Sequence, residues 1–233
     1  MQKAINVSDL LIFISKAVEK SFQDNFKIDE NKCVIVYNGI NKKFLESKQI
    51  EKQKENTNII FVGRLEKVKG VDILIKAFGE VYDKDNKIQL TIVGNGTERK
   101  NLENLAKEVK GSENIKFVGR QNNVIDWLDK SNIFVYPSIW EEGFGISVIE
   151  AMSRGCIPIT FHKGGLVEII ENGKNGYLVD EVDYKKLSDA ILKVINLNNE
   201  EREKMIKKAI NTSKKFTIEK TIQTLGQAYK NLK

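Results

Sequence analysis

The stretch Ser138–Met152, SIWEEGFGISVIEAM, decides how the rest of this chain is interpreted. It follows the apolar run Ile133–Tyr136 and leads into a segment of helical character that Gly155 ends. Two glycines beside a helix start, Gly143 and Gly145, allow the backbone to come close to a ligand. The first turn of such a helix offers unpaired N–H groups and the positive end of the helix dipole. The stretch therefore predicts a strand, a tight loop and a helix whose start suits an anion such as phosphate.

Two acidic side chains belong to the same stretch. Glu142 lies in the loop, and Glu150 lies about one turn inside the helix, so the two would stand at different depths of one site. A carboxylate cannot bind phosphate, but it accepts hydrogen bonds from sugar hydroxyls. Together these features indicate a nucleotide sugar. On spacing alone the alternative is equally open, because Gly-Phe-Gly could form only a turn and the dipole alone favours an acid near a helix start.

Apolar, strand-like runs alternate with helix-like segments from residue 58 onward. We expect strands at 58–62, 88–93, 114–118, 132–136, 156–160 and 176–179, and helices at 70–82, 97–109, 122–129, 145–154, 183–196, 200–214 and 217–232. This alternation predicts an α/β fold with a doubly wound, Rossmann-like parallel sheet. Ligands of such sheets bind beyond the carboxyl ends of the strands, and the glycine motifs of this chain fall at those ends.

The first 57 residues predict a strand at 10–14, a helix from a Ser15 cap to about Phe26, a strand at 33–37 and a polar linker at 46–57. Both strands are apolar throughout, as in strands that are covered on both faces. Two strands cannot cover themselves, so a covering partner is expected. We therefore divide the chain into an incomplete N-terminal βαβ piece with its linker (1–57), a nucleotide-sugar-binding domain (58–214) and a last helix (215–233), which the family resemblance given below makes a crossing helix.

A second motif, Phe61–Gly70 or FVGRLEKVKG, runs from a strand end into a helix. Arg64 could bind a diphosphate as a planar fork and Lys69 as a point charge. The alternative is that both are solvated cations in a lysine-rich protein.

Two further patterns argue against other classes of site. Thr91–Gly96 ends in G-x-G, but Arg99 stands where a nicotinamide dinucleotide motif would have its next glycine. The sequence Asp83-Lys84-Asp85 has the D-x-D form of some metal sites, yet it follows a helix with no strand before it, so we expect a solvated turn and no metal.

Composition limits the function classes further. The formal charge is +6, but the charges alternate in sign and no nucleic-acid-binding module appears. One histidine, His162, and two distant cysteines, Cys33 and Cys156, cannot form a zinc cluster or a Cys/His pair, and we expect both thiols to be buried in a reducing compartment. No run approaches the ~18–20 apolar residues of a membrane span. We expect a cytoplasmic protein, with the inner face of the membrane, and peripheral contact with it, left open.

Both motifs resemble those of a known family. Residues 142–151, with E-G-F-G and then E-A, resemble the E-x7-E motif of retaining glycosyltransferases of the GT-B fold, specifically the GT4 family. Residues 63–70, G-R-L-x-x-x-K-G, resemble the diphosphate-binding loop of that family, and the two motifs stand in the family order. Ser15 after a strand, and Asn-Gly-Ile at 38–40, are similar to the exit of the family's first domain.

The resemblance implies roles for individual residues. Arg64 and Lys69 would hold the diphosphate and stabilise the leaving group, Glu150 would accept the ribose hydroxyls, and Glu142 would contact the donor sugar near its anomeric centre. We place Glu142, Arg64 and Lys69 in the catalytic set. The donor site would also include Gly63, Gly94, Gly96, Val118, Gly119, Gly143, Phe144, Gly145 and Ile146, with Val118–Arg120 near the base and a Gly-Gly pair at 164–165 near the sugar.

The resemblance also implies the chemistry. A UDP- or GDP-sugar is the expected substrate, with no separate cofactor and no metal. Transfer to a glycan, lipid or other acceptor would retain the anomeric configuration, by front-face transfer without a covalent intermediate, in cell-surface polysaccharide biosynthesis. Two alternatives remain open: a non-catalytic nucleotide-sugar-binding subunit of a split enzyme, and a sugar-nucleotide epimerase on the same fold.

The chain resembles the family's second domain in full but only the last βαβ piece of its first domain. It could be a fragment, a truncated gene product or one subunit of a split enzyme, and its partner would be a chain with the missing first domain or a second copy. The last helix carries an apolar stripe at Ile218, Ile222, Leu225, Tyr229 and Leu232. By resemblance this stripe faces the first domain; the alternative is that it packs on this chain's own sheet.

Overall fold

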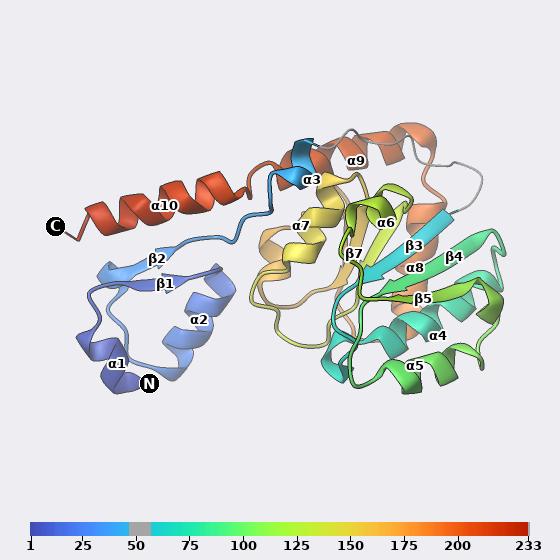
Figure 1. Cartoon of the computed structure of the whole chain (residues 1–233), viewed down its shortest axis with the longest axis horizontal. Helices are drawn as coiled ribbons and strands as arrows, with labels where there is room; N and C mark the ends of the chain where they lie inside the picture. The colour runs from blue at the N-terminus through green and yellow to red at the C-terminus, as the bar shows by residue number, and fades with distance from the viewer. Residues whose placement is uncertain (47–56, 233) are drawn as a thin grey trace.

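The computed structural model describes residues 1–46 and 57–232 (Figure 1). The linker expected at 46–57 therefore lies almost wholly outside the described residues. The larger unit is a six-stranded sheet in which every pairing is parallel, in the order β5-β4-β3-β6-β7-β8. Its strands are β3 (Thr57–Val62), β4 (Ile88–Val93), β5 (Ile115–Gly119), β6 (Ile133–Tyr136), β7 (Ile157–Phe161) and β8 (Tyr177–Val179). The doubly wound α/β fold expected from the sequence is confirmed.

The order of the strands fixes where a ligand can bind. The chain starts at the centre with β3, builds outward to β5, and returns to the other side of β3 with β6. Such a reversal opens a crevice at the carboxyl ends of the two central strands. Because parallel crossovers are right-handed, the helices that connect β3 to β4 and β4 to β5 cover one face, and the helix that connects β6 to β7 covers the other.

Two helical layers cover the sheet (Figure 1). On one face α4 (Val71–Tyr82) packs against α5 (Arg99–Ala106) and α8 (Tyr184–Ile195), and on the other α7 (Ile146–Ser153) packs against α9 (Asn199–Ser213). The short α6 (Ile125–Asp129) precedes β6. The expected helices all form, but α5 ends three residues early because Lys107 and Glu108 hydrogen-bond three residues back, as in a 3₁₀ turn.

The smaller unit, at the N-terminus, is a two-stranded parallel sheet of β1 (Leu11–Phe13) and β2 (Cys33–Ile35), joined by α2 (Lys16–Asn25). The Ser15 hydroxyl accepts a hydrogen bond from the Val18 N–H at 3.1 Å, so the expected cap of α2 is confirmed. A first helix, α1 (Gln2–Val7), was not expected from the sequence. Ile12 of β1 is 39 % exposed, so the described chain does not cover both faces of this small sheet.

The two units are joined by segments that run side by side. After β2 the chain passes through Ile40 into α3 (Lys43–Glu46), and after α9 it returns through Phe216 into α10 (Ile218–Lys230), which runs along β2 (Figure 1). Main-chain hydrogen bonds link the two crossings, from Ile40 N–H to Phe216 C=O at 3.0 Å and from Ile218 N–H to Ile40 C=O at 3.3 Å.

The apolar stripe of α10 faces solvent in this chain. Ile222 is 63 % exposed and Tyr229 is 56 % exposed, whereas Ala228 is the buried residue of the helix. The alternative in which the stripe packs on this chain's own sheet is therefore wrong. Within the described ranges, none of the helices combines the length and the apolar character needed to cross a membrane.

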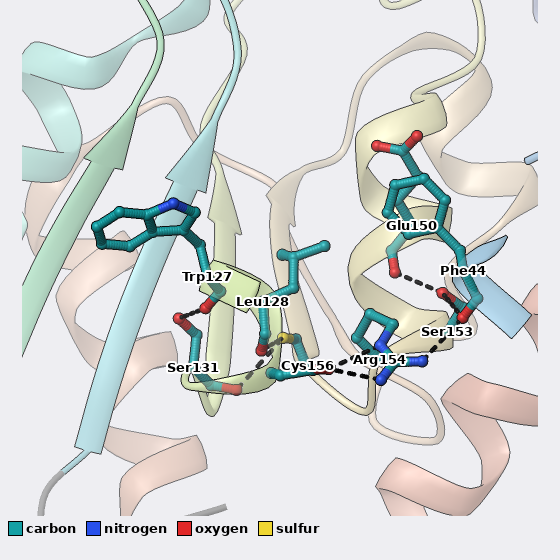
Figure 2. Close-up of polar contacts among 9 residues, drawn as sticks. Phe44, Trp127, Leu128, Ser131, Glu150, Ser153, Arg154 and Cys156 are labelled. Atoms are coloured by element: carbon teal, nitrogen blue, oxygen red, sulfur yellow. Dashed lines mark hydrogen bonds and ion pairs between the residues drawn. The ribbon is translucent and has the colours of Figure 1, made fainter. Parts of the chain in front are cut away.

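A buried charged residue ties three helices together at the base of the sheet (Figure 2). Arg154, at the end of α7, is 1 % exposed and donates two hydrogen bonds to Asp129 of α6, at 2.7 and 2.9 Å. It also donates to the Phe44 carbonyl of α3 at 3.1 Å. The nearby Cys156 is buried, as expected, and its thiol lies 3.3 Å from the carbonyls of Leu128 and Ser131.

Candidate active site

The two sequence motifs meet because their strands are neighbours. β3, which precedes the Arg64–Lys69 loop, pairs with β6, which precedes the Glu142 loop. The Lys69 ammonium contacts the Glu142 carboxylate, with Nζ and Oε1 2.5 Å apart. The side chains are 13 % and 12 % exposed, so the pair is largely withdrawn from water.

The loops that carry these side chains are fastened to each other. The Ile139 N–H donates to the Val68 carbonyl at 3.0 Å, and Ser138 Oγ lies 3.2 Å from the same oxygen. Gly70 has φ of 62°, and a Cβ there would lie 2.2 Å from the Pro137 carbonyl oxygen. A side chain at Gly70 would therefore force the loops apart.

Two hydroxyl groups complete the cluster around Lys69 and Glu142. Lys69 Nζ donates to the Tyr136 hydroxyl at 2.8 Å, and Ser138 Oγ donates to Glu142 Oε1. Burial pulls the pKa of Lys69 down, but the hydrogen bonds to Glu142 and Tyr136 outweigh it, so the pKa is raised overall. Burial, and then the Glu142 charge, raise the pKa of Tyr136. The raised pKa keeps the largely buried Lys69 side chain charged.

Glu150 is a partly buried acid on α7. Its carboxylate points away from Arg154 and Ser153 (Figure 2) and accepts no hydrogen bond from the described residues. Burial raises its pKa to about 7, against the opposing effect of the Lys43 charge. Its oxygens are available to hydroxyl donors from a ligand.

Three other residues of the expected site differ in exposure: Arg64 and Ile146 are exposed, and Phe144 is buried. Arg64 lies two residues beyond the end of β3 and is exposed, with no ion pair to any described residue. Ile146, at the start of α7, is 42 % exposed. Phe144 is 2 % exposed, and its ring packs against Tyr37 and Phe216 with centroids 5.4 and 5.3 Å away. Phe144 thus belongs to the core, and only its backbone can face a donor.

Three glycines of the expected donor site lie against other parts of the chain. A Cβ at Gly94 would lie 1.8 Å from the Gly63 carbonyl oxygen, and one at Gly96 would lie 2.3 Å from the Leu65 carbonyl oxygen. A Cβ at Gly145, where φ is 98°, would lie 2.5 Å from a methyl group of Leu166. These positions need glycine because loops at the carboxyl edge pack tightly on one another.

Gly143 lies where the two units of the chain meet. A Cβ there would lie 3.0 Å from the Ile14 side chain, just beyond β1.

The segment expected to read the base is hydrogen-bonded within the chain. The Val118 carbonyl accepts from Gln121 Nε2 at 2.6 Å, and the Gly119 carbonyl accepts from the Gly94 N–H at 2.9 Å. Each carbonyl keeps a second lone pair, so base contacts would share these acceptors. Arg120 is exposed, as expected.

The loop after β7 closes over the Glu142 loop. Gly164 N–H donates to the Glu141 side chain at 2.6 Å, and Gly165 N–H donates to the Glu142 carbonyl at 2.7 Å. His162 pairs instead with Asp180, at 2.8 Å. The Gly-Gly pair is therefore beside Glu142, where the resemblance expects the donor sugar.

The D-x-D pattern forms the solvated turn that the sequence predicts. Asp83 pairs with Lys110, and both side chains are more than half exposed. Across residues 1–46 and 57–232, no three His, Cys, Asp or Glu side chains gather as a metal site.

Sequence reasoning missed Glu168, which bridges the two units. Its carboxylate accepts from the backbone N–H groups of Lys16 and Ala17, at 3.1 and 2.9 Å, and from the Tyr37 hydroxyl at 2.8 Å. Burial, and then the hydrogen bond to Glu168, raise the pKa of Tyr37 to about 12. The helix start at Ser15 was a signal, because it leaves N–H groups that need an acceptor.

Comparison with known families matches residues 42–212 to the family described as glycosyl transferases group 1. The chain belongs to this family. An uncharacterized glycosyltransferase of Methanocaldococcus jannaschii is 32 % identical to this chain over 228 residues, 97 % of this chain and 60 % of the relative. A Campylobacter jejuni 4-alpha-N-acetylgalactosaminyltransferase, named for a diphospho-undecaprenol acceptor, is 32 % identical over 178 residues, 76 % of this chain and 47 % of the relative.

Solved structures share the fold of this chain. A Rickettsia africae glycosyltransferase superposes with a TM-score of 0.88 at 21 % identity, over 99 % of this chain and 66 % of the other. Anabaena HepE, solved with UDP and glucose, gives 0.86 at 20 % identity, over 98 % and 65 %. These neighbours are GT-B glycosyltransferases, so the GT-B fold is confirmed. The chain spans 60 % of the M. jannaschii relative's length.

Proposed function

We propose that this group 1 glycosyltransferase supplies the donor site of a GT4-type retaining enzyme that takes a UDP- or GDP-sugar. One observation carries the proposal: a charged, largely buried lysine and a glutamate meet at the carboxyl ends of β3 and β6, at the switch point of the sheet. Glu150, an acid without a described hydrogen-bond donor, is on the helix that follows. The site thus combines a cation for a diphosphate with acids for hydroxyls.

Each group has a defined part in the reaction. Lys69 and Arg64 neutralise the diphosphate as the bond from the anomeric carbon to the phosphate oxygen breaks. The acceptor oxygen bonds to the same face of that carbon, which retains its configuration, and the acceptor's proton passes to the departing phosphate oxygen. Glu142 orients the sugar through its hydroxyls, and Glu150 binds the ribose.

The family and the named relatives are glycosyltransferases. These similarities favour a transferase over the two alternatives, an epimerase and a non-catalytic binding subunit. The acceptor proposed is a glycan or a lipid-linked saccharide of the cell surface, in line with the names of the Campylobacter jejuni relative and of a Staphylococcus aureus capsular polysaccharide glycosyltransferase. We propose a cytoplasmic location for this chemistry.

Calorimetry with the 233-residue chain tests the donor site. A thermal-shift panel of UDP-, GDP- and other nucleotide sugars first selects the base. Lys69→Ala should then weaken binding of the chosen nucleoside diphosphate by about tenfold or more, since a charge-assisted hydrogen bond is lost. Lys67→Ala, an exposed lysine of the same loop, is the matched control and should change little.

A second variant separates the nucleoside from the phosphates. Glu150→Gln should weaken the full nucleotide but not pyrophosphate, because only the nucleotide carries ribose hydroxyls. Unchanged nucleotide affinity in Lys69→Ala would contradict the diphosphate assignment, and equal losses for both ligands in Glu150→Gln would contradict the ribose assignment.

A further inference from the structure

Two buried hydroxyls flank the charged pair and come from the same strand end. Tyr136 is the last residue of β6, and Ser138 follows two residues later. They are 6 % and 0 % exposed. The Tyr136 hydroxyl accepts from Lys69 and also hydrogen-bonds Glu142, and the Ser138 hydroxyl donates to Glu142.

We propose that Tyr136 and Ser138 are positioning residues that hold Lys69 and Glu142 as a preformed pair, each with one hydrogen-bonding group left for the donor substrate. The inference deepens the proposed function and rests on it.

Counting donors and acceptors shows what remains for a ligand. An ammonium group has three N–H donors, and Lys69 uses two of them, on the Tyr136 hydroxyl and on Glu142, so one is left for a phosphate oxygen. The Glu142 carboxylate accepts from Lys69 and Ser138 at Oε1 and also hydrogen-bonds the Tyr136 hydroxyl. A carboxylate has about four lone-pair sites, so one is left for a sugar hydroxyl.

The Tyr136 hydroxyl is a fixed anchor because its ring is held by the sheet. The ring stacks with Phe61 of β3 and Phe134 of β6, with centroids 6.0 and 6.1 Å away. Lys69 Nζ also lies 5.2 Å from the ring centroid, within the range of a cation–π contact. The strand thus sets the position of the ammonium group.

The Ser138 hydroxyl performs the corresponding task for Glu142. It donates its one proton to Glu142 Oε1, the shorter of its two contacts, and its oxygen lies 3.2 Å from the Val68 carbonyl in the lysine loop. Without it, Oε1 loses one of its hydrogen-bond donors, and the carboxylate is held less firmly against rotation about its terminal bond.

Tyr136→Phe tests the anchor of Lys69. Affinity for the nucleoside diphosphate selected by the panel, UDP or GDP, should fall by about tenfold, as expected for one lost hydrogen bond to a charged group. Tyr136 and Glu142 are the titratable groups that raise the pKa of Lys69, so the ammonium should titrate at lower pH in the variant. Carbon-13 NMR of labelled lysines, assigned with Lys69→Ala, measures this, and Tyr177→Phe, another buried strand tyrosine, is the control.

Ser138→Ala tests the orientation of Glu142. The preference for UDP-glucose over UDP, or for GDP-mannose over GDP, should fall by about tenfold, while affinity for the diphosphate alone stays within about twofold. Ser188→Ala, a buried serine bonded to the Lys185 carbonyl, is the matched control. A merely structural serine would lower thermal stability and affect both ligands equally.

The outcomes separate this inference from the proposed function. If wild type binds the nucleotide sugar but Tyr136→Phe and Ser138→Ala bind and titrate as wild type does, the positioning role is overturned. If wild type binds neither diphosphate nor sugar nucleotide, the proposed function fails and the substrate role of these residues fails with it. An unshifted Lys69 titration in Tyr136→Phe would show separately that the hydroxyl does not hold the ammonium.

Discussion

At the scale of single residues, the chemistry of this chain is set by how far charges are withdrawn from water. Hydrogen bonds from Lys69 to the Glu142 carboxylate and the Tyr136 phenol offset the cost of burying its ammonium group, so Lys69 stays charged. Glu150 has no such compensation from a hydrogen bond, and its pKa rises to about 7 as a result of burial. The same loss of water thus favours charge on one residue and protonation on the other, according to the partner each has.

The raised pKa of Glu150 predicts a pH dependence of stability. A carboxyl whose pKa is higher in the folded state binds more protons when folded, so stability falls as pH rises from about 4.5 to about 7. Relative to Glu150→Gln, wild type should lose on the order of 2 kcal/mol of unfolding free energy between pH 5 and pH 8. Urea denaturation at both pH values measures this.

Glu80→Gln, which removes an exposed helical glutamate, is the control for the loss of a carboxylate in general. A difference between wild type and Glu150→Gln that is the same at pH 5 and pH 8 would contradict the prediction.

Some of these residue properties could be predicted from the sequence and others could not. The pairs Arg64 with Lys69 and Glu142 with Glu150 stood out because charged residues at strand ends mark sites in parallel sheets. Phe144 shows the limit of this method, since its place in a glycine motif favoured a ligand contact and its ring is in the core. Only the positions of Tyr37 and Phe216, far away in the sequence, decide that.

At the scale of elements, Arg154 shows how three short helices are fixed. α3 has four residues, α6 has five and α7 has eight, and such short helices have little stability of their own. The buried guanidinium links them by bonds to Asp129 and to the Phe44 carbonyl. The end of α7 is therefore fixed to the base of the sheet while its start lies at the site.

Breaking this link on one side should be costly. Asp129→Asn leaves the Arg154 charge buried without its counter-ion, and we expect a loss of about 3–5 kcal/mol of unfolding free energy. The double variant Asp129→Leu with Arg154→Met removes both charges and should recover much of the loss. Chemical denaturation of the three proteins measures it, and a double variant less stable than Asp129→Asn would argue against a charge-based explanation.

The elements themselves could be predicted well from the sequence, for a physical reason. Strands such as β6 and β7 are buried along their whole length and so are written as uninterrupted apolar runs. The helix α1 has no such signal, because Ile5 is its one buried residue. The short helix α3 likewise could not be predicted, because it lies in a polar segment. Arg154 holds it by a hydrogen bond to the Phe44 carbonyl.

At the scale of the whole molecule, Glu168 is the polar contact that holds the small N-terminal unit against the larger one. It satisfies N–H groups at the start of α2 and the Tyr37 hydroxyl together. Because it lies on the same short helix as Gly164 and Gly165, which touch the Glu142 loop, it connects the interface to the site.

Glu168→Gln should loosen this interface without unfolding the sheet. A neutral amide has one acceptor oxygen where the carboxylate has two, so one of the N–H groups of Lys16 and Ala17 loses its acceptor. Hydrogen–deuterium exchange at these amides should accelerate by about tenfold, while β6 and β7 stay protected. Glu171→Gln, an exposed acid nearby, is the control, and unchanged exchange at the start of α2 would contradict the role of Glu168.

The paired crossings at Ile40 and Phe216 have a mechanical consequence. A single connecting segment would let the two units rotate about it in any direction, whereas two segments joined by main-chain hydrogen bonds restrict the motion to bending about one axis. Twisting one unit against the other would break those hydrogen bonds, and bending would not. A Cβ at Gly39 would lie 2.2 Å from the Thr217 carbonyl carbon, so glycine lets the two segments pack together. A larger residue at this position should separate the segments and allow the two units to twist against each other.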